Sequence, residues 1–422
     1  MSSFIVEGLA GKASLEGSVA IRGAKNSVLP IMAASLVVPG ETILTNVPMI
    51  ADVASMASLL EGVGAYVTCK DNQCSVRTQD ARGSVLQSDV AKRLRASVLL
   101  TGAVLARTGK VVFPHPGGCV LGSRPIDLFL SGLTALGAVV TENEEITTIE
   151  APQGMVGGEL FFRVPSVTAT ETFMIAATLA KGPVTLKNCA MEPEVVVLAA
   201  YLKSRGADIE GEGTPTILIR PSHLEANSTP FIINPDRIET GSFLILGALL
   251  GKDITITNTN PAHCEALIDT LCAMGVSVHT TPTEIRVSRP DIIKSASIRT
   301  HEYPGFPTDL QAPISVLLTQ AEGESSILET IFDGRLNYTQ ELVRMGADIS
   351  VVNPHKALIK GPSLLKARDI DGPDIRAGLA FLLAAATASG TSKIGNAHLI
   401  DRGYEAIDEK LSALGLSIKR VA

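Results

Sequence analysis

LEGVGAYV, at residues 60–67, is the first of six near-copies of one short phrase in this chain of 422 residues. Each copy has a leucine four residues before a glycine and a valine or isoleucine three residues after it. The other five copies are LTALGAVV (133–140), LKSRGADI (202–209), LCAMGVSV (271–278), LVRMGADI (342–349) and LSALGLSI (411–418). The six glycines are separated by 73, 69, 69, 71 and 69 residues, whereas solenoid repeats are about 20–50 residues long. The spacing therefore predicts six small α/β modules rather than a solenoid.

A second phrase recurs with the same period. An alanine- and leucine-rich stretch such as IMAASLVV (31–38) is typical of a helix, and a β-branched run such as ETILTNV (41–47) is typical of a strand. A glycine stands between the two, and we expect it to end the helix in the left-handed conformation. These glycines are Gly40, Gly109, Gly182, Gly251, Gly323 and Gly390. Each module is thus predicted to run helix, strand, helix, strand, strand.

The length of the chain predicts two domains of three modules each, because one hydrophobic core rarely grows to this size. The best linker candidates are residues 11–23 and the stretch around Asn234 and Pro235, which separates the third module from the fourth. We therefore expect one domain from residues 1–22 and 234–422, and a second from residues 23–233. A cleft between two such domains is the expected place for a site.

Composition excludes several classes of function. The net charge is −7, aromatic residues make up 4% of the chain and there is no Trp, which argues against a nucleic-acid surface. The N-terminal segment shows no basic-then-apolar signal pattern, and no stretch of 18 uncharged apolar residues is present. These features predict a cytoplasmic protein with neither a membrane nor a nucleic-acid partner.

The cysteines are Cys69, Cys74, Cys119, Cys189, Cys264 and Cys272. Without an export signal a reduced state is expected, and no CxxC pair or nearby His pair predicts a metal site. No cofactor is expected either. Cys119 differs from the others because it lies in a loop of three prolines and three glycines, residues 114–125, near Arg124. That setting favours a reactive thiol. His115 is the only nearby partner for a Cys–His nucleophile, and no third residue can be assigned, so a cysteine hydrolase is disfavoured.

Charged residues in turn-like settings form a third group. Arg22 and Lys25 flank a small-residue turn just before a predicted helix, a pattern that suits an anion, although a solvated helix start is the simpler interpretation of five residues. The others are Arg95, Asp236, Arg237, Asp309, Arg376 and Arg402. Singly, each is more often a surface ion pair. Together they would fit a substrate that bears both phosphate and carboxylate.

Eight motifs in a fixed order allow a resemblance to be stated. They are GAKN (23–26), RAS (95–97), PGGCVLGSRPIDL (116–128), SVTATE (166–171), PDRIETG (235–241), YPGFPTDLQA (303–312), ETIFDGR (329–335) and IDRGYE (400–405). Over its full length the chain resembles the UDP-N-acetylglucosamine enolpyruvyl transferases, which perform the first committed step of peptidoglycan synthesis. The resemblance implies a two-domain inside-out α/β barrel with six repeated units and an active site in the interdomain cleft.

The resemblance also implies a reaction and roles for individual residues. The 3-hydroxyl of the sugar attacks C2 of phosphoenolpyruvate while C3 is protonated, and the tetrahedral intermediate then loses phosphate. Cys119 would be the proton donor and Asp309 the general base at the 3-hydroxyl, with Lys25 and Arg402 also catalytic. The residues implied to bind phosphoenolpyruvate are Lys25, Asn26, Arg124, Arg376 and Arg402. Those implied to bind the UDP-sugar are Arg95, Arg124, Pro125, Ile126, Asp127, Leu128, Ser166, Val167, Asp309 and Ile331.

The chain departs from the family pattern at four positions, which are Phe129, Val164, Thr168 and Leu399. They affect the nucleotide side rather than the implied acid or base. Two alternatives stay open. One is the sister enzyme that makes enolpyruvylshikimate phosphate, although GAKN and the cysteine loop differ from the motifs of that enzyme. The other is a UDP-sugar sensor without catalytic activity on the same fold.

Overall fold

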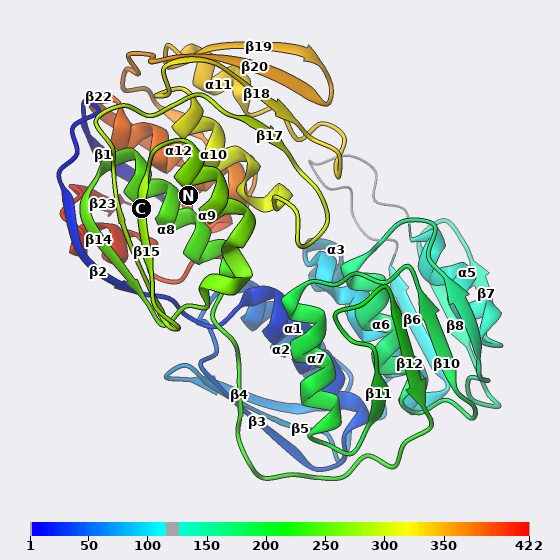
Figure 1. Ribbon diagram of the computed structural model, residues 1–422. Helices are drawn as coiled ribbons and strands as arrows, with labels where there is room; N and C mark the ends of the chain where they lie inside the picture. Colours follow the sequence, from blue (N-terminus) through cyan, green and yellow to red (C-terminus); the bar gives the residue numbers. More distant parts are fainter. Residues whose placement is uncertain (1, 115–125, 422) are drawn as a thin grey trace. The chain divides into compact units, whose positions relative to one another are not determined.

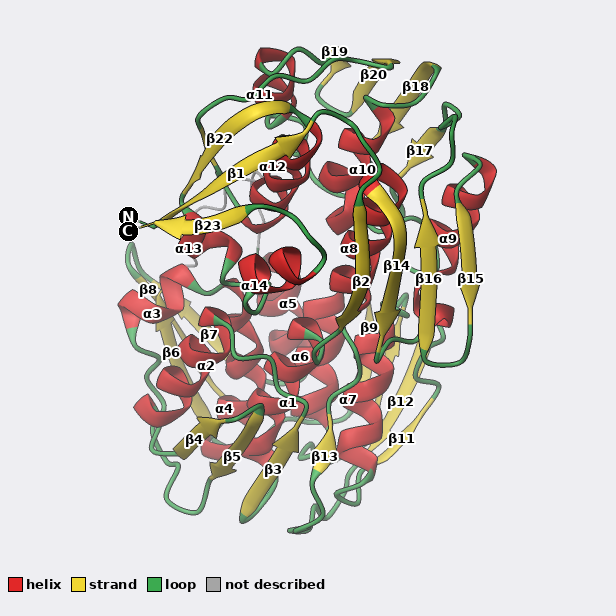
Figure 2. Ribbon diagram, turned by 90° about the vertical axis from the view of Figure 1, so that its left-hand side faces the viewer, coloured by secondary structure: helices red, strands yellow, loops and turns green. Residues whose placement is uncertain are grey.

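The computed structural model describes residues 2–114 and 126–421 (Figure 1). Within these residues the strands form six sheets, five of four strands and one of three (Figure 2). The backbone divides into a first unit, residues 2–22 and 235–421, and a second unit, residues 23–114 and 126–234. Each unit contains three sheets and its own hydrophobic core. The prediction of six α/β modules is therefore confirmed.

The first unit is built from three sheets and the helices packed against them. In spatial order, the strands of its first sheet are β21 (Ile370–Asp371), β22 (Ser389–Gly395), β1 (Ser3–Leu9) and β23 (Ile418–Val421). Those of the second are β15 (Ser277–Thr280), β16 (Glu284–Ser288), β14 (Gly251–Thr257) and β2 (Leu15–Ala20). Those of the third are β17 (Ser297–Arg299), β18 (Gly323–Leu328), β20 (Lys356–Gly361) and β19 (Asp348–Asn353). Its helices are α8 (Arg237–Leu250), η3 (Pro261–Cys264), α9 (Glu265–Ala273), η4 (Thr308–Leu310), α10 (Gln311–Leu318), α11 (Thr339–Arg344), α12 (Ile375–Thr387), α13 (Ala397–Ile400) and α14 (Ile407–Ala413).

The second unit repeats this plan. In spatial order, the strands of its first sheet are β13 (Phe231–Ile232), β3 (Glu41–Thr45), β5 (Gln73–Arg77) and β4 (Tyr66–Lys70). Those of the second are β11 (Asp208–Glu210), β12 (Thr216–Arg220), β10 (Val184–Lys187) and β9 (Gly158–Phe161). Those of the third are β6 (Lys110–Pro114), β8 (Ile146–Glu150) and β7 (Val139–Glu142). Its helices are α1 (Lys25–Ala34), η1 (Ser35–Val37), α2 (Ala51–Gly62), α3 (Ser88–Arg93), η2 (Arg95–Val98), α4 (Leu99–Thr108), α5 (Asp127–Ala135), α6 (Val167–Ala177) and α7 (Pro193–Lys203).

One helix of each module is buried along nearly its whole length. Every residue of α10 is buried, as is every residue of α8 and α12 after the first. These three helices pack on one another inside the first unit, with the sheets around them (Figure 1), and α1, α4 and α6 do the same in the second. A helix that is apolar on all sides must be covered on all sides. This composition places helices inside and sheets outside, as expected for an inside-out barrel.

The six sheets share one pattern of pairing. In five of them one outer strand pairs parallel with its neighbour, as β2 does with β14, while the other pairs are antiparallel. In the three-stranded sheet a single parallel bridge between Val85 and Val112 takes the place of that outer strand. The internal repeat in the sequence is thus a repeat of sheet topology.

The glycines of the first phrase have a common conformation. All six have φ between +92° and +106°, which side chains other than glycine tolerate poorly. In the second phrase Gly40, Gly109, Gly323 and Gly390 also have positive φ, but Gly182 and Gly251 do not. A Cβ on Gly251 would lie 2.7 Å from the carbonyl oxygen of Gly247. The expected left-handed ending is therefore wrong at these two positions, and at Gly251 close backbone packing is the physical reason for glycine.

Asparagine marks a repeated turn that the sequence reasoning missed. The residue after the central strand of four modules is an asparagine with φ between +52° and +58°. In each case Nδ2 donates a hydrogen bond to a backbone carbonyl oxygen of a neighbouring segment. The four are Asn46, Asn188, Asn258 and Asn396. Asparagine is favoured here because its short side chain tolerates the left-handed region and bonds to nearby backbone.

Cys69 and Cys74 are joined by a disulfide in the structure. They lie directly opposite each other on β4 and β5, so the expectation that every cysteine is reduced is wrong for this pair. Cys189 and Cys264 are buried thiols, whereas Cys272 is exposed. Burial raises the pKa of Cys189 to about 11, so this thiol is inert at neutral pH. No helix in the described part of the chain is long and apolar enough to cross a membrane.

Candidate active site

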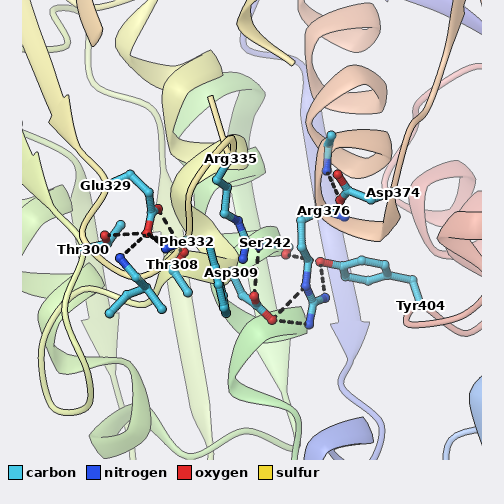
Figure 3. A network of polar contacts seen from close by, with 12 residues as sticks. Ser242, Thr300, Thr308, Asp309, Glu329, Phe332, Arg335, Asp374, Arg376 and Tyr404 are labelled. Carbon is cyan, nitrogen blue, oxygen red and sulfur yellow. Dashed lines mark hydrogen bonds and ion pairs between the residues drawn. The ribbon is translucent and has the colours of Figure 1, made fainter. Parts of the chain in front are cut away.

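Asp309 lies between two arginines in the first unit (Figure 3). It belongs to the short turn η4, which leads into the buried helix α10. Its Oδ1 accepts a hydrogen bond from Nη2 of Arg335 at 2.9 Å. Its Oδ2 accepts two from Arg376, from Nε at 3.0 Å and from Nη2 at 2.8 Å. Two guanidinium groups from distant segments thus hold both oxygens of one carboxylate.

The three side chains differ in exposure. The side chain of Asp309 is 27% exposed, whereas those of Arg335 and Arg376 are 3% and 9% exposed. Asp309 is therefore the most exposed side chain of this cluster. Burial alone would raise the pKa of Asp309, but the charges of Arg376 and Arg335 and their hydrogen bonds outweigh this effect. The net result holds the pKa well below its ordinary value.

Arg376 is positioned from three sides. It lies in the first turn of α12, whose N-cap Asp374 accepts hydrogen bonds from the backbone N–H groups of Arg376 and Ala377 at 2.7 and 3.0 Å. Its Nη1 donates to the hydroxyl of Tyr404 at 3.0 Å, and this hydroxyl is also 3.0 Å from the hydroxyl of Ser242. Burial alone would lower the pKa of Arg376, but the charge of Asp309 reverses the shift and raises it.

Glu329 organises the loop that precedes Arg335. Its side chain is fully buried and accepts hydrogen bonds from the backbone N–H groups of Ile331 and Phe332 at 2.8 and 3.2 Å. It also accepts from the hydroxyl of Thr300 at 3.0 Å and from that of Thr308, the neighbour of Asp309, at 2.9 Å. One carboxylate therefore ties the loop with Ile331 to the turn with Asp309 (Figure 3).

Lys25 forms a buried ion pair in the second unit. It is the first residue of α1, and its Nζ lies 2.6 Å from Oδ2 of Asp52 in the first turn of α2. The two side chains are 12% and 4% exposed. Asn26 follows Lys25 in the same helical turn, and α1 has no side chain that caps its N-terminus. The predicted anion-binding turn thus has a lysine paired with an acid at the start of a helix that no side chain caps.

Several residues predicted to bind the UDP-sugar lie where helices of the second unit begin. Ile126 precedes α5, and Asp127 and Leu128 form its first turn. Ser166 is the N-cap of α6 and accepts a hydrogen bond from the N–H of Ala169 at 3.3 Å, with Val167 the first helical residue. Arg95 begins η2.

The remaining predicted residues are placed as follows. Arg402 lies between α13 and α14 in the first unit. Among the four departures from the family pattern, Phe129 is buried, Val164 is 63% exposed, Thr168 is in α6 and Leu399 is in α13. Cys119, Arg124, Pro125 and His115 lie outside the described residues.

The structure brings together Asp309 and Arg376, which the sequence reasoning named, and adds Arg335, Glu329 and Tyr404, which it did not. Arg335 and Glu329 could have been found from the sequence, since both belong to the motif ETIFDGR. The signal at Glu329 was the repeat itself, because a glutamate stands there in place of asparagine. Asp52 had no such signal. In the described ranges no group of three or more His, Cys, Asp or Glu residues could hold a metal ion.

Comparison with known proteins then identifies the family. The family model of EPSP synthase (3-phosphoshikimate 1-carboxyvinyltransferase) matches residues 9–411. A protein of Desulfosudis oleivorans named UDP-N-acetylglucosamine 1-carboxyvinyltransferase is 41% identical over 423 residues, which cover 100% of both chains. A Nostoc protein of the same name is 42% identical over 411 residues, 96% of this chain and 92% of the relative.

Solved structures agree on the fold. The enolpyruvyl transferase NikO from Streptomyces tendae superimposes with a TM-score of 0.89 at 23% identity, over 100% of this chain and 99% of that one. EPSP synthase from Acinetobacter baumannii gives 0.73 at 17% identity, over 100% of both chains. The chain belongs to the EPSP synthase family of carboxyvinyl transferases. Within that family, full-length relatives at 41% identity are UDP-N-acetylglucosamine 1-carboxyvinyltransferases, and the resemblance inferred from the motifs is confirmed.

Proposed function

We propose that the protein transfers the carboxyvinyl group of phosphoenolpyruvate to the 3-hydroxyl of UDP-N-acetylglucosamine and releases phosphate. The observation that carries this proposal is the 41% identity along the whole chain to relatives named for that reaction. The product would enter peptidoglycan synthesis. The proposed partners are the two small substrates alone, and the proposed compartment is the cytoplasm.

The chemistry proceeds in two balanced steps. In the addition, the sugar 3-oxygen forms a bond to C2 of phosphoenolpyruvate, its proton passes to a base, and an acid delivers a proton to C3. In the elimination, the bond from C2 to the phosphate oxygen breaks and C3 loses a proton, which restores the double bond. We assign the acid to Cys119 and the base to Asp309. The 27% exposure of Asp309 supports this assignment, because a base must reach the proton that it accepts.

The anionic substrate is assigned to four cationic side chains and one amide. Lys25, Asn26, Arg124, Arg376 and Arg402 would bind phosphoenolpyruvate, with Lys25 and Arg402 stabilising the charge that develops as phosphate leaves. The buried pair of Lys25 with Asp52 supports this role, since a lysine held at a helix N-terminus is directed rather than mobile. Fixed cations of this kind orient the reacting face of the substrate.

The UDP-sugar is assigned to residues around the starts of α5, α6 and η2. Arg95, Ser166, Val167, Ile331 and the segment 124–128 would contact it. Backbone N–H groups at helix N-termini suit a diphosphate, and the positions of Asp127 and Ser166 at two such termini support the assignment. Ile331 is supported by its place on the loop that Glu329 fixes beside Asp309.

Phosphate release from phosphoenolpyruvate tests the function directly. The assay uses UDP-N-acetylglucosamine or shikimate 3-phosphate as acceptor, with wild type, Cys119→Ala and Asp309→Asn. Release with the UDP-sugar alone, and loss of that release in both variants, is the expected result. Release with shikimate 3-phosphate instead would assign the protein to the sister activity. Binding of the UDP-sugar without any release would indicate a sensor.

A further inference from the structure

Two residues that the proposed function assigns to different substrates are bonded to each other. Asp309 is assigned to the sugar hydroxyl and Arg376 to phosphoenolpyruvate, yet Oδ2 of Asp309 accepts two hydrogen bonds from Arg376. We propose that phosphoenolpyruvate competes with Asp309 for Arg376, so that the arginine exchanges the enzyme's carboxylate for an anionic group of the substrate while Arg335 retains Asp309. This inference rests on the proposed function and adds an order of events to it.

The edge of Arg376 that Asp309 occupies is the one an anion would need. Nε and Nη2 form the two-pronged edge of a guanidinium that binds carboxylate or phosphate. Both atoms donate to the single oxygen Oδ2 of Asp309, at 3.0 and 2.8 Å. Because the side chain of Arg376 is only 9% exposed, a substrate anion cannot approach this edge freely while Asp309 covers it. Binding through this edge therefore requires an exchange of partners.

The opposite side of Arg376 is independently held. Nη1 donates to the hydroxyl of Tyr404, which is in turn bonded to Ser242, and the ring of Tyr404 lies 5.4 Å from the guanidinium carbon. The backbone of Arg376 is fixed by the N-cap Asp374. These contacts do not involve Asp309, so they can persist while the Nε and Nη2 edge changes partner (Figure 3).

Arg335 provides the second hold on the acid. Its Nη2 donates to Oδ1, the oxygen that Arg376 leaves untouched. Its side chain is 3% exposed, and its guanidinium lies 5.3 Å from the centre of the Phe332 ring. Arg335 is thus too deeply buried to follow an exposed substrate easily. It is a positioning residue, which keeps the carboxylate in place when Arg376 is withdrawn.

The exchange would also strengthen Asp309 as a base. Both arginines lower the pKa of Asp309 by their charges, and a carboxylate with a strongly lowered pKa accepts a proton poorly. Transfer of Arg376 to the substrate removes one of these charges and brings an anion nearby, and both changes raise the pKa. The base would therefore become effective only after phosphoenolpyruvate has bound.

Equilibrium binding of phosphoenolpyruvate alone tests the exchange, since no transfer takes place without the acceptor. Asp309→Asn removes the competitor for Arg376, so titration calorimetry should show binding tightened about tenfold, within the usual range of a site-to-site coupling. If Asp309 did not compete for Arg376, the Asp309→Asn substitution would leave the affinity for phosphoenolpyruvate unchanged. Unchanged or weaker binding in a folded Asp309→Asn protein overturns the proposal.

Two controls separate the exchange from a general change of charge. Asp333→Asn removes a negative charge from the same loop as Arg335, where its side chain is 78% exposed, and should leave the affinity unchanged. In an Arg376→Gln background, Asp309→Asn should no longer tighten binding. Equal tightening in the Asp333→Asn variant or in the Arg376→Gln background would contradict the exchange.

A measurement on the wild type covers the case in which Asp309→Asn does not fold. In protein labelled with ¹³C at aspartate carboxyl groups, phosphoenolpyruvate should shift a carboxylate band in the infrared difference spectrum as Asp309 loses a partner. The Arg376→Gln variant should lack this shift, which separates Asp309 from Asp52, the partner of Lys25. Binding without such a shift would overturn the exchange. Failure of the wild type to bind phosphoenolpyruvate alone would also overturn the exchange, whereas absence of phosphate release in the presence of UDP-N-acetylglucosamine would refute the proposed function, so the two results are distinguished.

Discussion

Glu329 occupies in its module the position that Asn258 occupies in the module before it. Each residue directly follows the central strand, β18 or β14. Asn258 has φ of +52° and donates Nδ2 to the carbonyl oxygen of Ile21. Glu329 is fully buried and instead accepts from two hydroxyls and two backbone N–H groups. At this position of the repeat a side chain that donates a hydrogen bond is thus replaced by one that accepts hydrogen bonds, in the module that contains Asp309.

Glu329→Gln tests this role. The amide replaces one accepting oxygen by an NH₂ group that faces hydrogen-bond donors, so about 1–3 kcal/mol of the free energy of unfolding should be lost. The Michaelis constant for the UDP-sugar should also rise, because Ile331 loses its anchor. Urea unfolding and steady-state kinetics measure the two effects. Glu324→Gln on β18, where the side chain is 53% exposed, is the control and should change neither. A fully stable Glu329→Gln protein would show that the loop does not depend on this acid.

Asp52→Asn addresses the second unit. Removal of one partner from a buried ion pair such as that of Asp52 with Lys25 costs about 3–5 kcal/mol in typical cases. We expect reduced stability, together with weaker binding of phosphoenolpyruvate as Lys25 loses its direction. Thermal unfolding and calorimetric titration provide the measurements. The matched control is Asp71→Asn, since the pair of Lys70 and Asp71 is more than 80% exposed and such pairs contribute little. Equal effects of the two substitutions would contradict this expectation.

Gly415→Ala isolates backbone conformation from packing. Gly415 has φ of +98°, and a Cβ at this position would have no heavy atom within 4 Å. The substitution should therefore cost only the strain of the left-handed conformation, about 1–2 kcal/mol, as measured by the urea midpoint. Gly415→Asn should cost less, because asparagine tolerates the left-handed region better. A loss as large for asparagine as for alanine would argue against a conformational origin.

Glu171 predicts a stability that falls as the pH rises. Burial, followed by the charges of Glu194 and Glu192, raises the pKa of Glu171 well above its ordinary value of 4.5. Below pH 4.5 the group is protonated in both the folded and the unfolded chain and has no effect. Above it the unfolded chain loses the proton first, so the free energy of unfolding decreases until the folded pKa is passed. Glu171→Gln should therefore stabilise the protein at pH 8 but not at pH 4.

Urea unfolding at pH 4 and pH 8 measures this difference. Glu144→Gln, at an exposed position, is the control and should leave the pH dependence as in the wild type. If Glu171→Gln were equally stable or less stable than the wild type at pH 8, the neutral buried acid would be contradicted.

Much of the candidate site could be named from the sequence, but its connections could not. Asp309 stands in one of the eight motifs, and the resemblance implies a role for Arg376, whereas the hydrogen bonds between them join residues 67 positions apart. Arg335 is 26 positions from Asp309 and was quoted within its motif without a role. An ion pair between two loops forms only where the folded chain brings the loops together, and no local pattern of residues encodes the distance between them.

The sequence by itself determined the six modules and the left-handed conformation of four of the six second-phrase glycines. Both follow from short-range physics, because apolar periodicity and the tolerance of glycine for positive φ act within a few residues. Only the tertiary structure decided that Glu329 accepts where Asn258 donates, and that Asp309 is held between Arg335 and Arg376. These outcomes depend on which groups share a buried space, where each polar atom must find a partner. That requirement is met across segments far apart in the chain, so it becomes visible only once the chain has folded.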